Sequence, residues 1–124
     1  MAIVAPSLPS ASADSFTITN RSQHPITTTC SSKDDHLGTH DLIIGEERAW
    51  HFNGSPSTKF WCNFYKSDGK YLDQVVWSLS FNYVFHSSTI DLIWELKEAG
   101  IFLENGSKEN LFRGWSDVGF SPNH

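Results

Sequence analysis

The chain has 124 residues, a formal net charge of −5 and an aromatic content of 14%. This length fits a single domain that buries about two-thirds of its extended-chain surface, which is enough for a core without a structural metal. The negative charge and the scattered basic residues argue against a nucleic-acid partner, because phosphate binding needs clustered Lys and Arg. No apolar run approaches the ~20 residues of a membrane span, so membrane insertion is not expected.

Residues 1–14 form an expected disordered leader, rich in Ala, Ser and Pro. Within it, Ala11-Ser12-Ala13 has the small-x-small form of a signal-peptidase site. The apolar stretch is short and no Lys or Arg precedes it, so the leader predicts a weak or truncated secretion signal, with a flexible cytosolic tail as the alternative. Residues 116–124 are expected to form a flexible tail.

Alternation of apolar and polar residues is the dominant pattern along the rest of the chain. It is typical of strands with one buried face. The expected strands lie at 16–19, 25–30, 40–44, 49–52, 60–65, 78–85 and 89–99. Only the last of these segments has a short helix as an alternative to a strand. Glycines and Asn-Gly or Asp-Gly pairs separate them, so the prediction is an all-β domain, a sandwich or a barrel, with short connecting loops.

Three N-x-S sequons begin at Asn20, Asn53 and Asn105. Each is a candidate N-glycosylation site if the chain enters the secretory pathway. In the second and third sequons, Asn is followed by Gly. This pair is also typical of hairpin turns, because both residues tolerate positive φ.

The polar segment 28–52 raises the question of a metal site. His36 and His40 are four residues apart, which aligns two imidazoles only on a helix, and Gly38 lies between them. Cys30 or Asp35 would be a third ligand, but no established zinc or calcium spacing is present. A metal-binding or enzymatic domain centred on these side chains is therefore the alternative hypothesis.

A catalytic site is not predicted. No G-x-S-x-G nucleophile elbow occurs, and Cys30 and Cys62 lie on apolar strand faces, where thiols are usually inert. Glu46 and Glu47 are adjacent and would point to opposite faces of a strand. The preferred interpretation of the segment is structural: Ser and Asp side chains stabilise a turn, and Gly38 adopts a conformation that other residues resist.

Several motifs resemble those of the plant self-incompatibility protein family. The run Cys30-Ser-Ser-Lys-Asp-Asp-His-Leu-Gly38 is similar to its "CKSKDDDLG" signature, and Phe60-Trp-Cys-Asn-Phe64 to its "FWCxF" strand. The other similar elements are Ile18-Thr-Asn20, Gly45 with Trp50-His-Phe52, Trp94 and Gly100. The resemblance covers about residues 16–115, and we expect residues 15–115 to be the folded domain.

The resemblance implies a small, secreted antiparallel β-sandwich without enzymatic activity or cofactor. The later cysteines of the family would fall at Thr89 and Leu92, so the usual two-disulfide framework is absent. Cys30 and Cys62 are a candidate disulfide or remain free. By the same resemblance, the chain would act as a monomeric signalling ligand of an unidentified cell-surface receptor.

Receptor contacts are expected in the loops 31–38, 53–58, 66–70 and 86–88, since loops on a rigid sheet commonly carry recognition. The candidate contact residues are Lys66, Asp68, Lys70, Asp34 and Asp35. A weaker hypothesis is a carbohydrate-binding sandwich that uses exposed aromatic side chains, with the candidates Trp61, Tyr65, Trp77 and Trp115.

Overall fold

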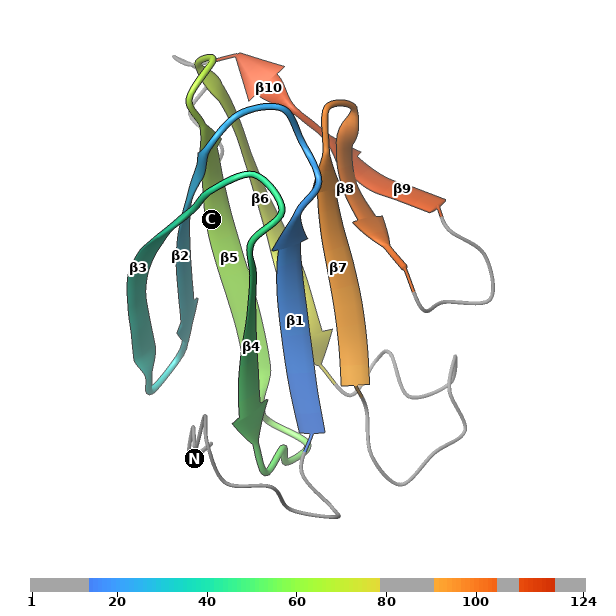
Figure 1. Ribbon diagram of the computed structural model, residues 1–124. Helices are drawn as coiled ribbons and strands as arrows, with labels where there is room; N and C mark the ends of the chain where they lie inside the picture. The colour runs from blue at the N-terminus through green and yellow to red at the C-terminus, as the bar shows by residue number, and fades with distance from the viewer. Residues whose placement is uncertain (1–13, 79–90, 105–109, 118–124) are drawn as a thin grey trace.

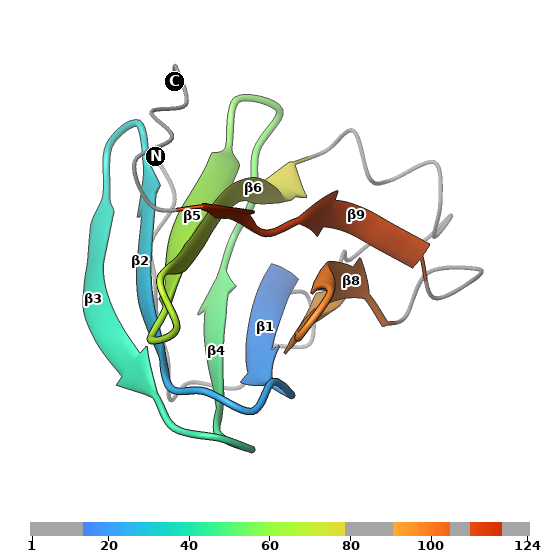
Figure 2. The ribbon, with the colours of Figure 1, turned by 90° about the horizontal axis from the view of Figure 1, so that it is seen from above.

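The computed structural model describes residues 14–78, 91–104 and 110–117. In these residues ten strands form two five-stranded sheets that pack face to face (Figures 1 and 2). The first sheet has the order β4 (Glu47–Phe52), β1 (Asp14–Asn20), β7 (Asp91–Lys97), β8 (Gly100–Leu103) and β9 (Asn110–Gly114). The second has the order β10 (Ser116–Asp117), β6 (Lys70–Ser78), β5 (Lys59–Lys66), β2 (Ile26–Ser32) and β3 (His36–Leu42). The predicted all-β sandwich is confirmed.

Most of the strands lie where the alternating pattern predicted them. In β7, Leu92, Trp94 and Leu96 are buried and the residues between them are not, so the competing helix is wrong for this segment. The strand predicted at 78–85 lies almost entirely outside the described residues. The preceding segment forms β6, which the sequence pattern did not identify.

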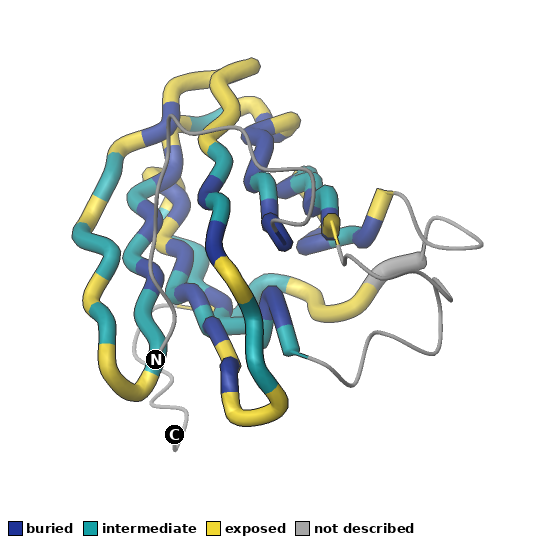
Figure 3. Tube along the Cα trace, turned by 90° about the horizontal axis from the view of Figure 1, so that it is seen from below, coloured by how far each residue is buried: buried dark blue, intermediate teal, exposed yellow. Residues whose placement is uncertain are grey.

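Aromatic side chains fill the space between the sheets. Phe16 of β1 stacks on Trp50 of β4, with ring centroids 5.0 Å apart. Phe52 lies 4.6 Å from Phe60 of the opposite sheet, and aromatic pairs at such distances add to the stabilisation from burial alone. The buried positions alternate with less buried ones along β2, β5 and β7, whereas β1 is buried at nearly every position (Figure 3). Within the part of the chain that the structure describes, no helix is long and apolar enough to traverse a bilayer.

Four connections gather at one end of the sandwich, the upper end in Figure 1. They are 21–25, 43–46, 67–69 and 98–99, and we call this the Asn20 end. The pairing of Ile26 with both Leu42 and Lys66 brings the first three together, and a bond from Arg21 N to Leu96 O adds the fourth. The β2–β3 turn and the β4–β5 connection lie at the opposite end.

The folded region extends slightly beyond its predicted limits. Asp14 begins β1, and Ser116 and Asp117 pair with Tyr71 and Lys70 of β6. Between β9 and β10 the chain crosses from one sheet to the other, and the Trp115 indole donates a 2.8 Å hydrogen bond to Lys97 O at this crossing.

Thr28 offers a test of the packing between the sheets. Its side chain is fully buried, and Oγ1 has no hydrogen-bond partner among the described residues. Valine has nearly the same shape without the hydroxyl, so Thr28→Val should raise the free energy of unfolding by about 1 kcal/mol, because a buried unpaired hydroxyl is costly. Urea denaturation measures the change, and a loss of stability would show that the hydroxyl is hydrogen-bonded in solution.

Candidate functional site

The polar segment after β2 folds as a tight hairpin. Ser32 N donates to Asp35 O at 2.7 Å, and Asp35 N donates to Ser32 Oγ at 3.1 Å, which closes the turn over residues 33–34. Gly38 follows with a φ of +87°, at the point where the register between β2 and β3 shifts. A glycine with positive φ at such a shift is typical of a β-bulge. The predicted turn, its Ser side chain and the role of Gly38 are confirmed. The predicted Asp contribution is not, because Asp35 takes part through its backbone and its Oδ2 has no partner among the described residues.

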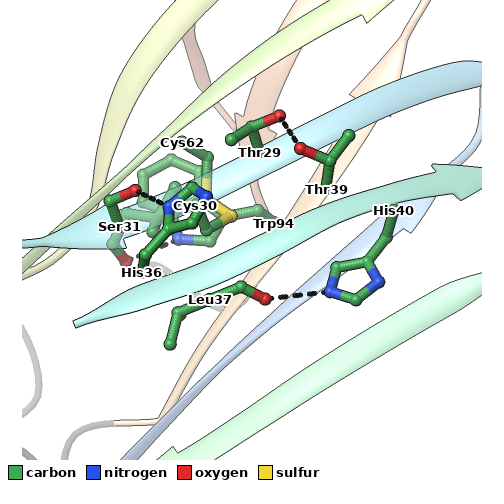
Figure 4. Close-up of a disulfide and its surroundings, with 10 residues drawn as sticks. Thr29, Cys30, Ser31, His36, Leu37, Thr39, His40, Cys62 and Trp94 are labelled. Atoms are coloured by element: carbon green, nitrogen blue, oxygen red, sulfur yellow. Dashed lines mark hydrogen bonds between the residues drawn. A yellow bond between two sulfur atoms is a disulfide. The ribbon is translucent and has the colours of Figure 1, made fainter.

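The alternative metal site at this hairpin is wrong. Cys30 forms a disulfide with Cys62 and therefore offers no thiolate to a metal (Figure 4). His36 Nδ1 is 2.9 Å from Ser31 Oγ, and His40 Nε2 is 3.0 Å from Leu37 O. Each side chain thus serves its own local contact, and the three do not converge.

The disulfide joins directly opposed residues of β2 and β5, whose Cα atoms are 4.0 Å apart. Both cysteines are fully buried. The candidate pairing is confirmed. Because disulfides persist in oxidising compartments, the bond fits an extracellular protein.

Asn20 is a structural residue of the Asn20 end. Its side chain is fully buried, and Nδ2 donates to the carbonyl oxygens of His24 and Leu42, both at 2.9 Å. Oδ1 accepts bonds from the backbone N and the hydroxyl of Ser22. A glycan on Nδ2 is incompatible with this packing, so the sequon prediction does not fit the folded chain at Asn20.

The second sequon differs from the first. Asn53 is exposed, and its glycosylation stays a prediction. Gly54 does not form a hairpin turn, because residues 53–58 connect strands of different sheets. A Cβ at Gly54 would lie 2.3 Å from the Trp77 ring, so the glycine is required for close packing rather than for positive φ. Asn105 lies outside the described residues.

Lys66 was predicted to contact a receptor, but its side chain is only 2% exposed. Its ammonium lies 3.2 Å from Glu98 Oε1, 3.3 Å from Asp68 Oδ2 and 4.9 Å from the centroid of the Trp115 ring. Lys66 therefore joins the β5–β6 and β7–β8 turns, and it is not available to a partner.

Glu98 is expected to make the stability of the fold depend on pH. The backbone N–H of Gln23 donates to it at 2.6 Å, and this bond, with those from Lys66 and His24, lowers the pKa of the carboxyl from 4.5 to about 2. Because the folded-state pKa is depressed, the stabilisation is present above about pH 4.5 and is lost as the pH falls towards about 2. Urea denaturation across this window should show a smaller loss for Glu98→Gln than for the wild type; equal losses would contradict the assignment.

The other predicted contact residues do not form one surface. Asp68 and Lys70 lie at the Asn20 end, and Lys70 pairs with Asp117. Asp34 and Asp35 lie in the β2–β3 turn at the other end, separated from them by the eight residues of β5, or about 27 Å of strand. The loop 86–88 lies outside the described residues.

Ile43 and Ile44 form an exposed apolar tip that the sequence did not single out. Their exposed fractions are 65% and 57%. The tip is a tight turn in which Glu46 N donates to Ile43 O at 3.0 Å and Ile43 N donates to the Glu46 carboxylate at 2.9 Å, with Gly45 at a φ of +87°. Bonds between Asn20 and both Gly45 and Glu46 fix this turn to β1.

Comparison with known proteins identifies the family. Residues 15–115 match the family described as plant self-incompatibility protein S1. The chain belongs to this family. No curated protein matches it significantly. Among solved structures, Serratia marcescens Lip, a membrane-bound component of the Type VI secretion system, is similar at 9% identity and a TM-score of 0.40, covering 76% of this chain and 98% of that one.

In this self-incompatibility S1 family protein, the motif residues that carried the resemblance are mainly structural. The buried ones are Ile18, Thr19, Asn20, Cys30, Trp50, Phe52, Phe60, Cys62, Phe64, Trp94 and Gly100. Trp77, one of the candidates for carbohydrate binding, is also buried, so a sugar ring cannot stack on it. Trp61 and Tyr65 remain partly exposed on the outer face of β5.

Proposed function

We propose that the chain is a secreted, non-enzymatic ligand that acts as a monomer on a receptor protein of the plant cell surface. The family is one of self-incompatibility proteins and is not known as enzymatic. The buried disulfide supports an extracellular location. Asn53, exposed in the β4–β5 connection, is the site we propose for a glycan.

The exposed Ile43–Ile44 tip is the main evidence for where the contact surface lies. Large apolar side chains on the surface of a monomer are costly when they gather, and such patches commonly mark interaction sites. The hydrogen bonds to Asn20 and Glu46 hold the tip in one conformation before binding. A pre-ordered tip loses little conformational entropy on docking, which favours affinity.

Charged residues border the tip and suit a protein partner. Arg21, Glu46, Glu47 and Arg48 are all exposed, so both signs of charge surround the two isoleucines. An apolar centre with a polar rim is the usual anatomy of a protein interface. Asp68 and Lys70 lie at the same end and remain contact candidates, whereas Asp34 and Asp35 would need a second surface.

Binding of fluorescently labelled protein to intact plant cells tests the proposal. We expect saturable binding that unlabelled protein displaces and that prior protease treatment of the cells abolishes. The double variant Ile43→Asp with Ile44→Asp should weaken binding at least about tenfold, because truncation or charging of a central interface residue commonly costs that much. Circular dichroism melting shows whether the variant keeps its fold.

Tyr65→Asp is the matched control, since Tyr65 is 46% exposed but lies on the outer face of β5. It should bind as the wild type does. Equal binding by the isoleucine variant would refute the contact surface, and binding that survives protease treatment would refute a protein receptor. A self-association that the isoleucine variant abolishes would show that the tip joins two copies of this chain.

A further inference from the structure

A second recognition feature lies away from the Asn20 end, beside β6. A pocket of about 520 Å³ opens there, within the size range of ligand sites. The described residues that line it come from β5, β6 and β9, and they are Lys59, Trp61, Asp73, Gln74, Val75 and Arg113. Figure 2 shows β9 passing alongside β6 as the chain crosses towards β10, which brings Arg113 to this rim.

The strand register explains why an indole faces the pocket. Trp61 pairs with Val75, and Asn63 pairs with Asp73, so Trp61 and Asp73 lie on the same outer face of the second sheet. The register shift between Phe60 and Trp61 bends the sheet at this point. Trp61 is only partly buried, so part of its ring borders the open space.

Two cations at the pocket lack partners. The side chains of Lys59 and Arg113 are exposed and form no hydrogen bond or ion pair with any described residue. With Asp73 as the one carboxylate of the lining, the formal charge of these six residues is +1, although the whole chain carries −5. The pocket is thus a basic site on an acidic protein, and it suits a ligand with a carboxylate, to which Arg binds through two parallel hydrogen bonds.

The remaining groups suit a sugar ring. The indole face is electron-rich and attracts the C–H face of a ring. The Gln74 amide donates one N–H to Val75 O at 2.9 Å, which leaves its oxygen and its second N–H for a hydroxyl group of the ligand. A simple anion would contact only the two cations and would leave the Trp61 ring without a contact. We propose that the pocket binds an acidic oligosaccharide, with a uronate residue stacked on Trp61 and its carboxylate between Lys59 and Arg113.

Isothermal titration calorimetry of the full chain with trigalacturonate tests this assignment. We expect measurable binding that weakens at higher salt, since exposed charges are screened. The pair Lys59→Gln with Arg113→Gln, and separately Trp61→Ala, should each weaken binding at least about tenfold, as should methyl esterification of the probe. Lys33→Gln, which removes one exposed cation from the β2–β3 turn, is the control for loss of positive charge away from the pocket and should bind as the wild type does.

Each other outcome overturns a definite part of the proposal. No heat with trigalacturonate refutes the site, provided that melting shows the protein folded. Equal binding of the methyl ester refutes the uronate carboxylate as the determinant, and displacement by inorganic sulfate at the same concentration shows a simple anion site. An equal loss with Lys33→Gln shows non-specific attraction. None of these results bears on the Ile43–Ile44 tip, which lies at the other end of β5, so the two proposals fail independently.

Discussion

Replacing Cys30 and Cys62 together with alanine is expected to lower the free energy of unfolding by about 3–4 kcal/mol. The disulfide closes a loop with a sequence separation of 32, and that loop contains β3 and β4, one edge strand of each sheet. Without the bond, the unfolded chain gains conformational freedom that the wild type lacks. Urea denaturation under oxidising conditions compares the two proteins.

Chemical reduction supplies the control for this result. Reduced wild type should approach the stability of the double variant, and the double variant should not respond to reductant. A loss below about 1 kcal/mol would mean that the unfolded chain is already restricted in this region, because the chain-entropy argument assumes an open unfolded state.

Trp94→Ala should cost about 3–5 kcal/mol, the range for removing a large aromatic side chain from a core. Trp94 is fully buried in β7, and its indole N–H donates a 2.8 Å hydrogen bond to Val76 O of β6. It thus ties one sheet to the other. Trp94→Phe keeps most of the ring but leaves the carbonyl of Val76 without its donor, so a smaller loss of about 1–3 kcal/mol is expected.

Thermal and urea denaturation of both variants provide the measurement, with Trp61→Ala as the control. Trp61 belongs to β5 of the other sheet, and its side chain lies on the outer face of that sheet. Its removal should cost clearly less than that of Trp94. Equal losses for the two alanine variants would contradict the view that Trp94 joins the sheets.

Local patterns predicted the parts of the fold that depend on neighbours in sequence. Alternation identified β7, and the Ser-Asp turn with Gly38 predicted the β2–β3 hairpin. The strand β6 was missed because Val76 and Trp77 are adjacent and both fully buried, which breaks the two-residue period at the bulge opposite Phe60 and Trp61. A bulge of this kind depends on the partner strand, which the sequence does not display.

The candidate sites depended on distant partners and were harder to predict. Lys66 looked like the exposed side chain of a hairpin, but Glu98, 32 residues later, and Trp115 enclose it. Ile43 and Ile44 followed Leu42 as one apolar run, and only the turn at Gly45 exposes them. The partner of Cys30 required the register between β2 and β5, which sequence spacing alone leaves open.

Site-specific photo-crosslinking on living plant cells tests the central claim, that the Asn20 end of a disulfide-linked sandwich contacts a receptor protein. A photoreactive residue replaces Ile44 in one protein and Asp34, at the opposite end, in another. The account predicts that position 44 links covalently to one cell-surface protein, that excess unlabelled ligand prevents the link, and that position 34 captures nothing. Capture from position 34 alone, or from neither position while the labelled proteins still bind the cells, would contradict it.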